Sequence, residues 1–228
     1  PIIILIMLFP IIGGIFYLIF GVKNNENKQW KKMMKVEKKR KTIMKQSAET
    51  FEKLQKESSV AAKQSGYIYK YDFSPIYENT KMTYLALGEV KHYQLLSELK
   101  KAKKYIFLEY FIIAEGRMWD SILDILLRKL DEGVDIRIIY DDLGSRASLP
   151  NNYAKKLNKM GLRCYVFNPL SLRLSMKMNS RDHRKICIID GLVGFTGGIN
   201  LGDEYINAYD KLGHWKDTAI RIKGEAVW

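Results

Sequence analysis

A small group of polar residues and glycines has the types and spacing needed for chemistry on a phosphate ester. It combines a histidine, a lysine, an aspartate, two glycines and an asparagine: His183, Lys185, Asp190, Gly197, Gly198 and Asn200. An imidazole nitrogen can attack phosphorus to form a covalent phosphohistidine, while an ammonium and an amide stabilise the non-bridging oxygens without a metal ion. Adjacent glycines let the backbone approach an anion closely. The group therefore predicts phosphate chemistry.

These residues lie on a predicted β-hairpin. The Asp190-Gly191 pair is typical of a two-residue turn, here between strands expected over residues 183–189 and 192–196. Residues two apart on a strand face the same way, so we expect His183 and Lys185 to project together. Asp190 lies at an odd offset from His183 and in the turn, so a structural role suits it at least as well as a catalytic one.

Several other polar residues have two interpretations each. Glu109 interrupts an apolar strand, and it either lies at the functional edge of the sheet or pairs with a lysine at the strand end. Asp203 and Glu204 could orient His183, although an exposed turn is the simpler interpretation. An isolated His-x-Lys would be interpreted as a surface histidine and a solvated lysine, but the fixed offsets of the other members favour a site.

The elements that must position the group alternate between short β-rich runs and amphipathic helices, which is typical of an α/β layer. Strands are expected over residues 82–87, 105–113, 134–140 and 162–167, and helices over residues 89–104, 118–130 and 150–160. The apolar face expected for the first helix consists of Val90, Tyr93, Leu95, Leu96, Leu99 and Ala102. Tyr110 and Phe111, in the strand over residues 105–113, are expected in the core.

The first 22 residues contain no charged side chain. At about 1.5 Å of rise per residue a helix of this length reaches roughly 33 Å, enough to cross a hydrocarbon core of about 30 Å. No basic region precedes the segment and no small-residue cleavage site follows it, which disfavours a signal peptide. The sequence therefore predicts a transmembrane helix over residues 1–22.

A basic segment follows the apolar one. Residues 23–45 hold ten Lys or Arg against Glu26 and Glu37, so +8 of the net charge of +13 lies there. The positive-inside rule then places the rest of the chain in the cytoplasm. The lysines either contact anionic lipid headgroups or serve only as a topology signal. Membrane lipid is therefore a better-supported partner than nucleic acid, and helical spacing extends to about residue 60.

Composition sets the outer limits. A content of 47% hydrophobic and 28% charged residues excludes a disordered tail, a collagen-like fibre and a disulfide mini-protein. Cys164 and Cys187 lie in apolar runs, which indicates buried, reduced thiols, and no His/Cys metal-ligand spacing is present. Three parts are expected: a membrane helix (1–22), a basic juxtamembrane linker (23–66) and a catalytic part (67–228). Because the chain begins with Pro1 and stops at Trp228, we expect a fragment.

The six residues resemble the HxKxxxxD...GGxN signature of the phospholipase D superfamily. Within that superfamily the chain is most similar to bacterial cardiolipin synthases. The segments that carry this resemblance are LEYFII at 108–113, IYDDLGS at 139–145, DHRKICIIDGLVGFTGGINLGDEY at 182–205 and HWKDTAIRIKG at 214–224. The resemblance covers essentially the whole chain. It implies one phospholipase D-like half-domain, a mixed β-sheet flanked by helices, behind the membrane helix.

The resemblance also implies an activity and roles for residues. A histidine takes the phosphatidyl group of one phosphatidylglycerol, glycerol leaves, and a second phosphatidylglycerol accepts the group to form cardiolipin, with no cofactor and no metal. His183 would be the nucleophile, Lys185 and Asn200 would contact phosphate, Asp190 would support, and Gly197 and Gly198 would line the substrate site. Which of the family's two histidines attacks stays open.

A second motif completes the site in this family, and neither His92 nor His214 heads one here. The resemblance therefore implies that a second half-domain of the same full-length chain is missing, and that this fragment alone is inactive, because one histidine cannot be both nucleophile and leaving-group acid. Phosphatidylglycerol and anionic membrane lipids are the expected partners, at the cell membrane with the catalytic part cytoplasmic. The alternatives are a phospholipase D-type hydrolase or nuclease, and an inactive lipid-binding half-domain.

Overall fold

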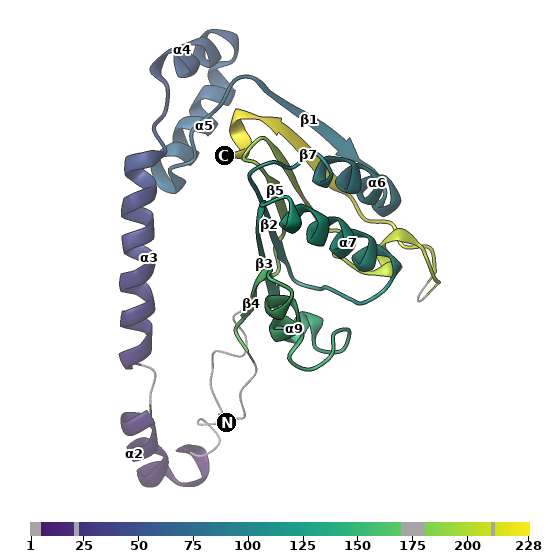
Figure 1. Ribbon diagram of the computed structural model, residues 1–228. Coiled ribbons are helices and arrows are strands. Elements are labelled where there is room, and N and C mark those ends of the chain that lie inside the picture. The colour runs from purple at the N-terminus through teal and green to yellow at the C-terminus, as the bar shows by residue number, and fades with distance from the viewer. Residues whose placement is uncertain (1–5, 21–22, 170–180, 211–212) are drawn as a thin grey trace. The chain divides into compact units, whose positions relative to one another are not determined.

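The computed structural model describes residues 6–20, 23–169, 181–210 and 213–228. It divides the chain into two compact units, Pro1–Ile76 and Tyr77–Trp228 (Figure 1). The first unit is helical. The second contains the sheet and all six residues of the predicted site.

The described part of the first unit includes the helices α2 (Pro10–Phe20), α3 (Lys23–Ile43), α4 (Ala48–Glu57) and α5 (Ser59–Asp72). Serines begin the last two. Ser47 Oγ accepts a hydrogen bond from Thr50 N at 3.2 Å, and Ser58 Oγ accepts one from Ala61 N at 3.3 Å. Each hydroxyl satisfies one of the backbone N–H groups left unpaired at a helix start. Helical structure thus extends to Asp72, beyond the expected limit near residue 60.

The apolar segment is interrupted. Residues 1–5 and 21–22 lie outside the described part, and the helix bends at Phe9 before α2 begins at Pro10. A residue that precedes proline is disfavoured in the α-helical conformation, which accounts for the bend. Among the residues that the structure describes, no helix is both long and apolar enough to cross a membrane. The membrane helix predicted over residues 1–22 is therefore not supported by this structure.

A seven-stranded mixed sheet forms the second unit, in the order β1-β7-β6-β5-β2-β3-β4. The strands are β1 (Thr80–Leu85), β2 (Tyr105–Tyr110), β3 (Asp135–Asp141), β4 (Arg163–Phe167), β5 (Lys185–Ile189), β6 (Val193–Gly197) and β7 (Ala219–Gly224). The pairs β2/β3 and β3/β4 are parallel and the other four pairs are antiparallel. The α/β prediction with a mixed sheet is confirmed.

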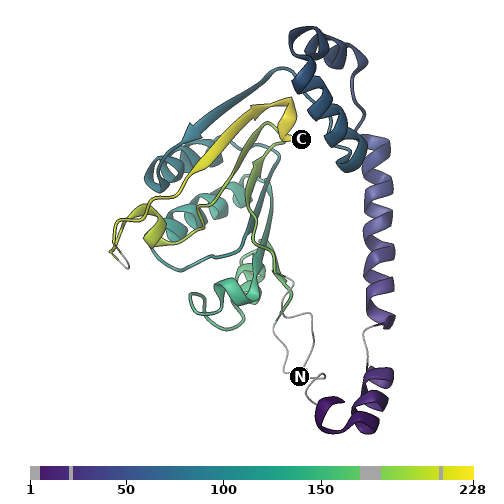
Figure 2. The same cartoon turned by 180° about the vertical axis from the view of Figure 1, so that it is seen from behind.

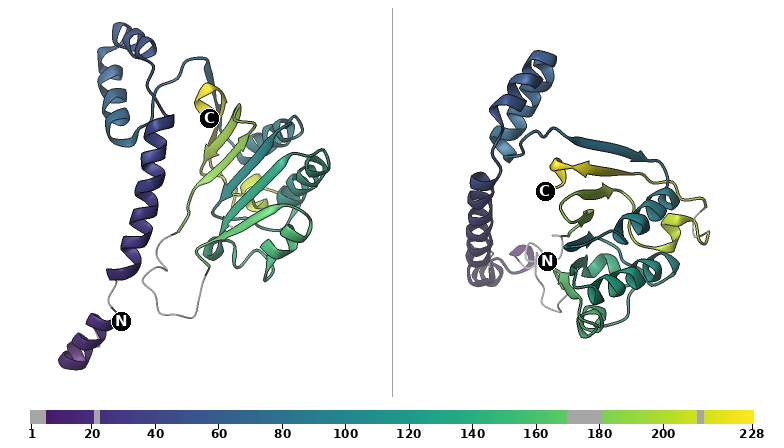
Figure 3. Two further views of the ribbon diagram at one scale, coloured as in Figure 1. Left: turned by 60° about the vertical axis from the view of Figure 1, so that its left-hand side comes forward. Right: turned by 45° about the horizontal axis from the view of Figure 1, so that its top comes forward.

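Helices pack on one face of this sheet, as Figures 1 and 3 show: α6 (Gly88–Leu99), α7 (Arg117–Asp131) and α9 (Tyr153–Lys159). Three short helical elements are also present. They are α8 (Asp142–Ser145) directly after β3, η2 (Asp203–Ile206) directly after Gly202, and η3 (Glu225–Val227) directly after β7. Figure 2 shows the same arrangement from behind. The core lies between the helices and the sheet.

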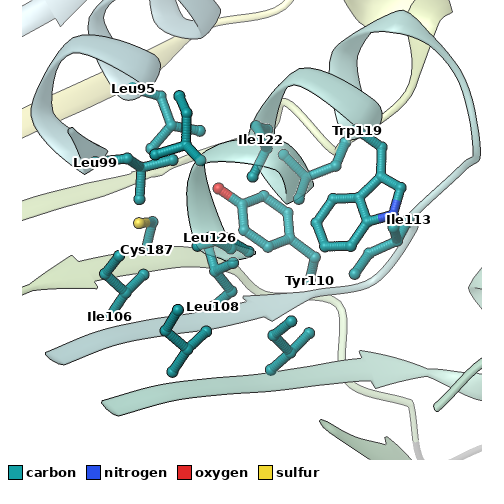
Figure 4. Close-up of a cluster of buried hydrophobic side chains, with 14 of the residues drawn as sticks. Leu95, Leu99, Ile106, Leu108, Tyr110, Ile113, Trp119, Ile122, Leu126 and Cys187 are labelled. Atoms are coloured by element: carbon teal, nitrogen blue, oxygen red, sulfur yellow. The ribbon is translucent and has the colours of Figure 1, made fainter. Parts of the chain in front are cut away.

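Alternation along β2 builds that core. Ile106, Leu108 and Tyr110 are buried, whereas the residues between them are half-buried. Figure 4 shows these side chains meeting those of the covering helices, among them Leu95, Leu99, Trp119, Ile122 and Leu126. Successive strand residues face opposite sides, so every second residue of β2 reaches the helices. Tyr110 is a core residue as predicted.

The face predicted for the first helix is partly wrong. Val90 and Tyr93 are 40% and 76% exposed, whereas Lys91 is buried together with Leu95 and Leu99. These three residues follow one another at four-residue spacing, which places them on one side of the helix. An apolar pattern cannot predict a lysine in the core, so the sequence favoured a face rotated toward Val90.

The predicted hairpin is confirmed. Asp190 and Gly191 have φ of 55° and 69°, and Leu192 N donates to Ile189 O at 3.0 Å. Positive φ at both central residues is the requirement of a type I′ turn, whose twist matches that of the flanking strands. The strands differ slightly from the expectation, because β5 begins at Lys185 rather than at His183.

Candidate functional site

His183 lies two residues before β5 begins, at the carboxyl ends of the parallel strands. Tyr110, the last residue of β2, pairs with Lys185, and Asp182 N donates to Asp141 Oδ2 at the end of β3 at 3.0 Å. The His183 side chain is exposed and lies against Phe111, with 4.6 Å between the ring centroids. Phe111, expected in the core, is thus a neighbour of the candidate nucleophile.

Lys185 is close to His183 but in a different environment. Its side chain is buried, and Nζ donates to the His183 carbonyl oxygen at 2.6 Å. Nζ also lies 5.2 Å from the centroid of the Phe111 ring. The pair therefore meets around Phe111, although the exposed imidazole precedes the strand and the buried ammonium begins it.

Burial changes the electrostatics of the Lys185 ammonium. Burial lowers the pKa of Lys185, while the negative charges of Asp217 and Asp182 act in the opposite direction. A poorly solvated ammonium gains more from an incoming anion than one that water already solvates. Lys185 thus has the environment required to stabilise the non-bridging oxygens of a bound phosphodiester.

The glycines of the predicted site are explained by close packing against the protein itself. A Cβ on Gly198 would lie 2.1 Å from Asp217 Oδ1, and a Cβ on Gly197 would lie 2.4 Å from the Thr218 carbonyl oxygen. Gly197 also has a φ of 153°, which L side chains rarely adopt. In the structure this backbone packs closely against residues 217–219. Its approach to an anion stays a prediction.

Asn200 connects loops around the site. Its buried amide accepts a hydrogen bond from Ile112 N at 3.0 Å through Oδ1 and donates one to the Tyr205 hydroxyl at 2.7 Å through Nδ2. The first bond takes residue 112 out of the β2 pairing, which explains why β2 ends at Tyr110 rather than at residue 113. Through these two bonds Asn200 links the backbone after β2 to Tyr205 in η2.

Asp190 lies at the far end of β5 from His183. Seven residues separate them, on the order of 20 Å along an extended chain. Its carboxylate accepts hydrogen bonds from Lys103 N, Lys104 N and Tyr105 N at 2.8, 2.8 and 2.9 Å. Burial alone would raise the pKa of Asp190, but these N–H donors lower it below the ordinary value. The structure thus does not bring Asp190 together with the histidine.

An ionic cluster lies beside His183, and of its members the sequence had indicated only Glu109. Arg184 Nη2 lies 2.6 Å from Glu109 Oε1, and Arg184 Nε donates to Asp182 Oδ1 at 2.9 Å. The pKa of Glu109 is raised to about 7. Burial is the main cause, and the hydrogen bond with Asp182 and the negative charge of Asp182 add to it, whereas the positive charge of Arg184 opposes the shift. Glu109 therefore lies near the carboxyl end of β2, beside the segment that carries His183, and its basic partner is an arginine rather than the expected lysine.

Lys91 is the residue that sequence reasoning missed. It is 2% exposed, and its Nζ donates to the Ile199 carbonyl oxygen at 3.1 Å and lies 4.8 Å from the Tyr110 ring centroid. Burial lowers its pKa to about 7, with Cys187 and Asp217 opposing the shift. Ile199 lies between Gly198 and Asn200, so this buried amine supports the backbone of the predicted motif. Its four-residue spacing with Leu95 was the available signal.

The remaining acidic candidates have structural contacts. Asp203 accepts hydrogen bonds from Arg117 N at 3.0 Å and Met118 N at 2.7 Å, which caps the start of α7. Glu204 Oε2 accepts a hydrogen bond from the Tyr209 hydroxyl at 3.5 Å. These contacts tie η2 to its surroundings and, for Asp203, favour the simpler interpretation over a direct role on His183.

Comparison with solved structures supports the fold. NucT from Helicobacter pylori matches with a TM-score of 0.50 and 14% identity, over 64% of this chain and 87% of that one. A phosphatidylserine synthase from Haemophilus influenzae also has a TM-score of 0.50, with 17% identity over 63% of this chain and 33% of its own. At these identities the likeness concerns the fold alone.

Sequence relatives are more informative. A cardiolipin synthase of Oceanobacillus iheyensis is 36% identical over 98% of this chain and 48% of its own length. The major cardiolipin synthase of Bacillus subtilis is 35% identical over 96% of this chain and 46% of its own. An uncharacterised protein of Streptococcus mutans is 49% identical over 71% of this chain and 35% of its own. The chain thus spans about half the length, or less, of these relatives.

The family model described as "Cardiolipin synthase, PLD-like domain" matches residues 95–218. That range contains every residue of the predicted phosphate site, together with Glu109, Arg184 and Asp217. Because the match covers more than half of the 228 residues, the chain belongs to the family of cardiolipin synthase PLD-like domains.

Proposed function

We propose that the protein to which this chain belongs transfers a phosphatidyl group from one phosphatidylglycerol to another, forming cardiolipin and releasing glycerol. The observation that carries the proposal is the exposed imidazole of His183 beside the buried ammonium of Lys185 at the carboxyl edge of the sheet. Cardiolipin synthases among the relatives supply the substrate class.

The proposed reaction has two displacements at phosphorus. A nitrogen of His183 forms a bond to phosphorus, the phosphorus–oxygen bond to glycerol breaks, and the glycerol oxygen takes a proton from an acid. A hydroxyl of the second phosphatidylglycerol then gives its proton back to that group and attacks phosphorus, and the phosphorus–nitrogen bond breaks. Lys185 stabilises the negative non-bridging oxygens in both steps.

In this proposal the other predicted residues hold the site in its geometry. The Asn200 amide links Ile112 to Tyr205, and Gly197 and Gly198 allow the end of β6 to pack against residues 217–219. Asp190 holds the hairpin against the backbone before β2. The proton donor belongs to a second, similar motif, which we assign to a further half-domain of the full-length protein; the relatives' greater length supports this assignment.

The substrate lies in a bilayer, so we also propose that the first unit attaches the protein to the membrane with its catalytic unit in the cytoplasm. Residues 1–22 carry no charge, and apolar side chains in their described part are exposed, among them Met7 at 78% and Ile11 at 80%. The following basic helix α3 suits contact with anionic headgroups. Fluorescence-quenching depth measurements on labels placed within residues 6–20 distinguish insertion from surface contact.

The proposal is tested with the complete gene product in membranes that contain labelled phosphatidylglycerol. Cardiolipin and free glycerol should appear together, and His183→Ala and Lys185→Ala should abolish or strongly reduce both. Lys81→Ala, at an exposed position of β1, is the matched control and should retain the activity. Release of phosphatidic acid without cardiolipin, or cleavage of added nucleic acid instead, would show a hydrolase and refute the proposal.

A further inference from the structure

One face of helix α5 presents large apolar side chains to solvent. We call Val60, Tyr67, Ile68 and Tyr71 the α5 stripe; they are 65%, 66%, 49% and 61% exposed. Their spacing of seven, eight and eleven residues from Val60 places them along one side of the helix. The Tyr67 and Tyr71 rings lie 4.6 Å apart between centroids. Large exposed apolar side chains that gather on one side of a helix mark a candidate interaction site.

The opposite side of α5 is its packing side. Ala62 is buried, and a Cβ on Gly66 would lie 3.5 Å from the Phe51 ring of α4. The Tyr69 hydroxyl accepts a hydrogen bond from Gln46 N at 3.2 Å. These contacts hold α5 against its neighbours in the helical unit and leave the α5 stripe outside that packing. The stripe is therefore not needed to fold the helix.

The chemistry of the α5 stripe suits the interface of an anionic bilayer. Tyrosine has an apolar ring and a polar hydroxyl, and it concentrates where one end of a side chain is in hydrocarbon and the other in water. Lys63 and Lys70 run along one edge of the stripe on the same helix, and Lys70 Nζ lies 5.4 Å from the Tyr71 ring centroid. Lysines in such positions extend their charge toward headgroups while their stems cover apolar surface.

The net charge of the helical unit also favours an anionic bilayer as the binding partner. Residues 23–76 hold 14 Lys or Arg against 6 Asp or Glu, a net charge of +8. Asp72, the acidic residue of α5, pairs with Arg40 at 3.4 Å. An anionic lipid surface complements this unit, whereas a basic partner is repelled.

We propose that the α5 stripe docks on the surface of an anionic bilayer, with Tyr67, Ile68 and Tyr71 in the headgroup region. This is an attachment in addition to residues 1–22, and it rests on the proposed function only for the presence of a membrane. Its strength depends on apolar contact plus attraction to anionic lipid, so it is reversible and weakens at high salt.

The test is a fluorescent label on the stripe of the full chain. Ile68→Cys is labelled with an environment-sensitive dye; Cys164 and Cys187 are both buried and do not compete for it. Gln55→Cys, at an exposed position of the neighbouring helix α4, is the matched control. Vesicles contain phosphatidylcholine alone or equal parts phosphatidylglycerol and phosphatidylcholine, and sedimentation measures the bound fraction of the chain.

With the phosphatidylglycerol vesicles, emission from residue 68 should rise several-fold and be quenched by nitroxides on the lipid acyl chains, whereas residue 55 should respond little. Both effects should fall in phosphatidylcholine, at high salt, and in Lys63→Glu/Lys70→Glu. Tyr67→Ser/Tyr71→Ser should reduce the response at residue 68 while far-ultraviolet circular dichroism stays unchanged.

Three outcomes would overturn the proposal. The label at residue 68 could stay solvent-exposed on chains that sediment with phosphatidylglycerol vesicles, or the chain could fail to bind them. The label could also be protected without vesicles in a manner that depends on protein concentration, which would show a second copy covering the stripe. None of these measurements involves turnover, so a failure here is distinguishable from a failure of cardiolipin synthesis in the complete protein.

Discussion

The two ends of strand β5 belong to one sequence motif but have opposite physical character. At its start, His183 is exposed, Lys185 is buried with a lowered pKa, and Glu109 has a pKa raised to about 7. At its end, three backbone N–H groups satisfy the Asp190 carboxylate. The two ends of one continuous motif thus differ. Ionisable groups with shifted pKa values lie at the first end, which suits chemistry, whereas the carboxylate at the second end is satisfied by hydrogen bonds, which suits holding the fold.

The largest effect expected from this contrast is at His183. His183→Ala in the complete protein should lower the turnover number for cardiolipin formation at least about 10³-fold, because the covalent route is lost. The side chain is exposed, so the urea midpoint of the isolated chain should hardly change. Kinetics with labelled phosphatidylglycerol and urea unfolding measure the two quantities. Retained turnover would place the reacting nitrogen elsewhere.

Lys185 comes next. Lys185→Met removes the buried ammonium while keeping most of its volume, and it should lower the turnover number by about 10²–10³-fold, the usual cost of losing a preorganised oxyanion ligand. Burying that charge opposes folding, so stability should stay equal or increase. Steady-state kinetics of the complete protein test the first part. A rise in KM at unchanged turnover number would instead indicate that Lys185 contributes only to binding.

Asp190 should show the reverse pattern. Asp190→Ala leaves three backbone donors without their carboxylate and should lower the free energy of unfolding by about 1–3 kcal/mol. Turnover of the folded fraction should change much less than in the Lys185 variant. Urea unfolding of the isolated chain and activity per folded molecule of the complete protein separate the two effects. A turnover loss as large as that of His183→Ala, at unchanged stability, would contradict the contrast between the two ends.

Glu109 should give the smallest effect, and one that depends on pH. Its pKa is raised from about 4.5 to about 7, so the folded state favours the protonated form and its stabilising contribution is lost as pH rises through 7. Glu109→Gln should therefore gain stability relative to the wild type between pH 5 and pH 8, on the order of 1–2 kcal/mol. Unfolding at both pH values measures this. A constant difference would mean that Asp182 and Arg184 leave the Glu109 pKa near its ordinary value.

Much of the architecture was accessible from local pattern. Alternation along residues 105–110, the four-residue periods of the helices and the Asp190-Gly191 turn all depend on neighbours within a few positions. The α/β layer followed from these elements, and the grouping of His183 with Lys185 followed from their spacing. The mixed sheet was implied only by the resemblance to the phospholipase D superfamily. The expected helix over residues 1–22 illustrates the limit, because apolar composition alone did not show the bend before Pro10.

The environment of the site required contacts between residues far apart in the chain. Lys91 meets Ile199 across 108 positions and Asp190 meets Lys103 across 87, and local spacing predicts neither of these two pairings. A pKa depends on burial and on charges within a few ångströms, which only the folded arrangement supplies. Residue type and spacing therefore predicted a phosphate site, whereas three-dimensional packing determined which of its residues lie together at the carboxyl edge of the sheet and which hold the hairpin in place.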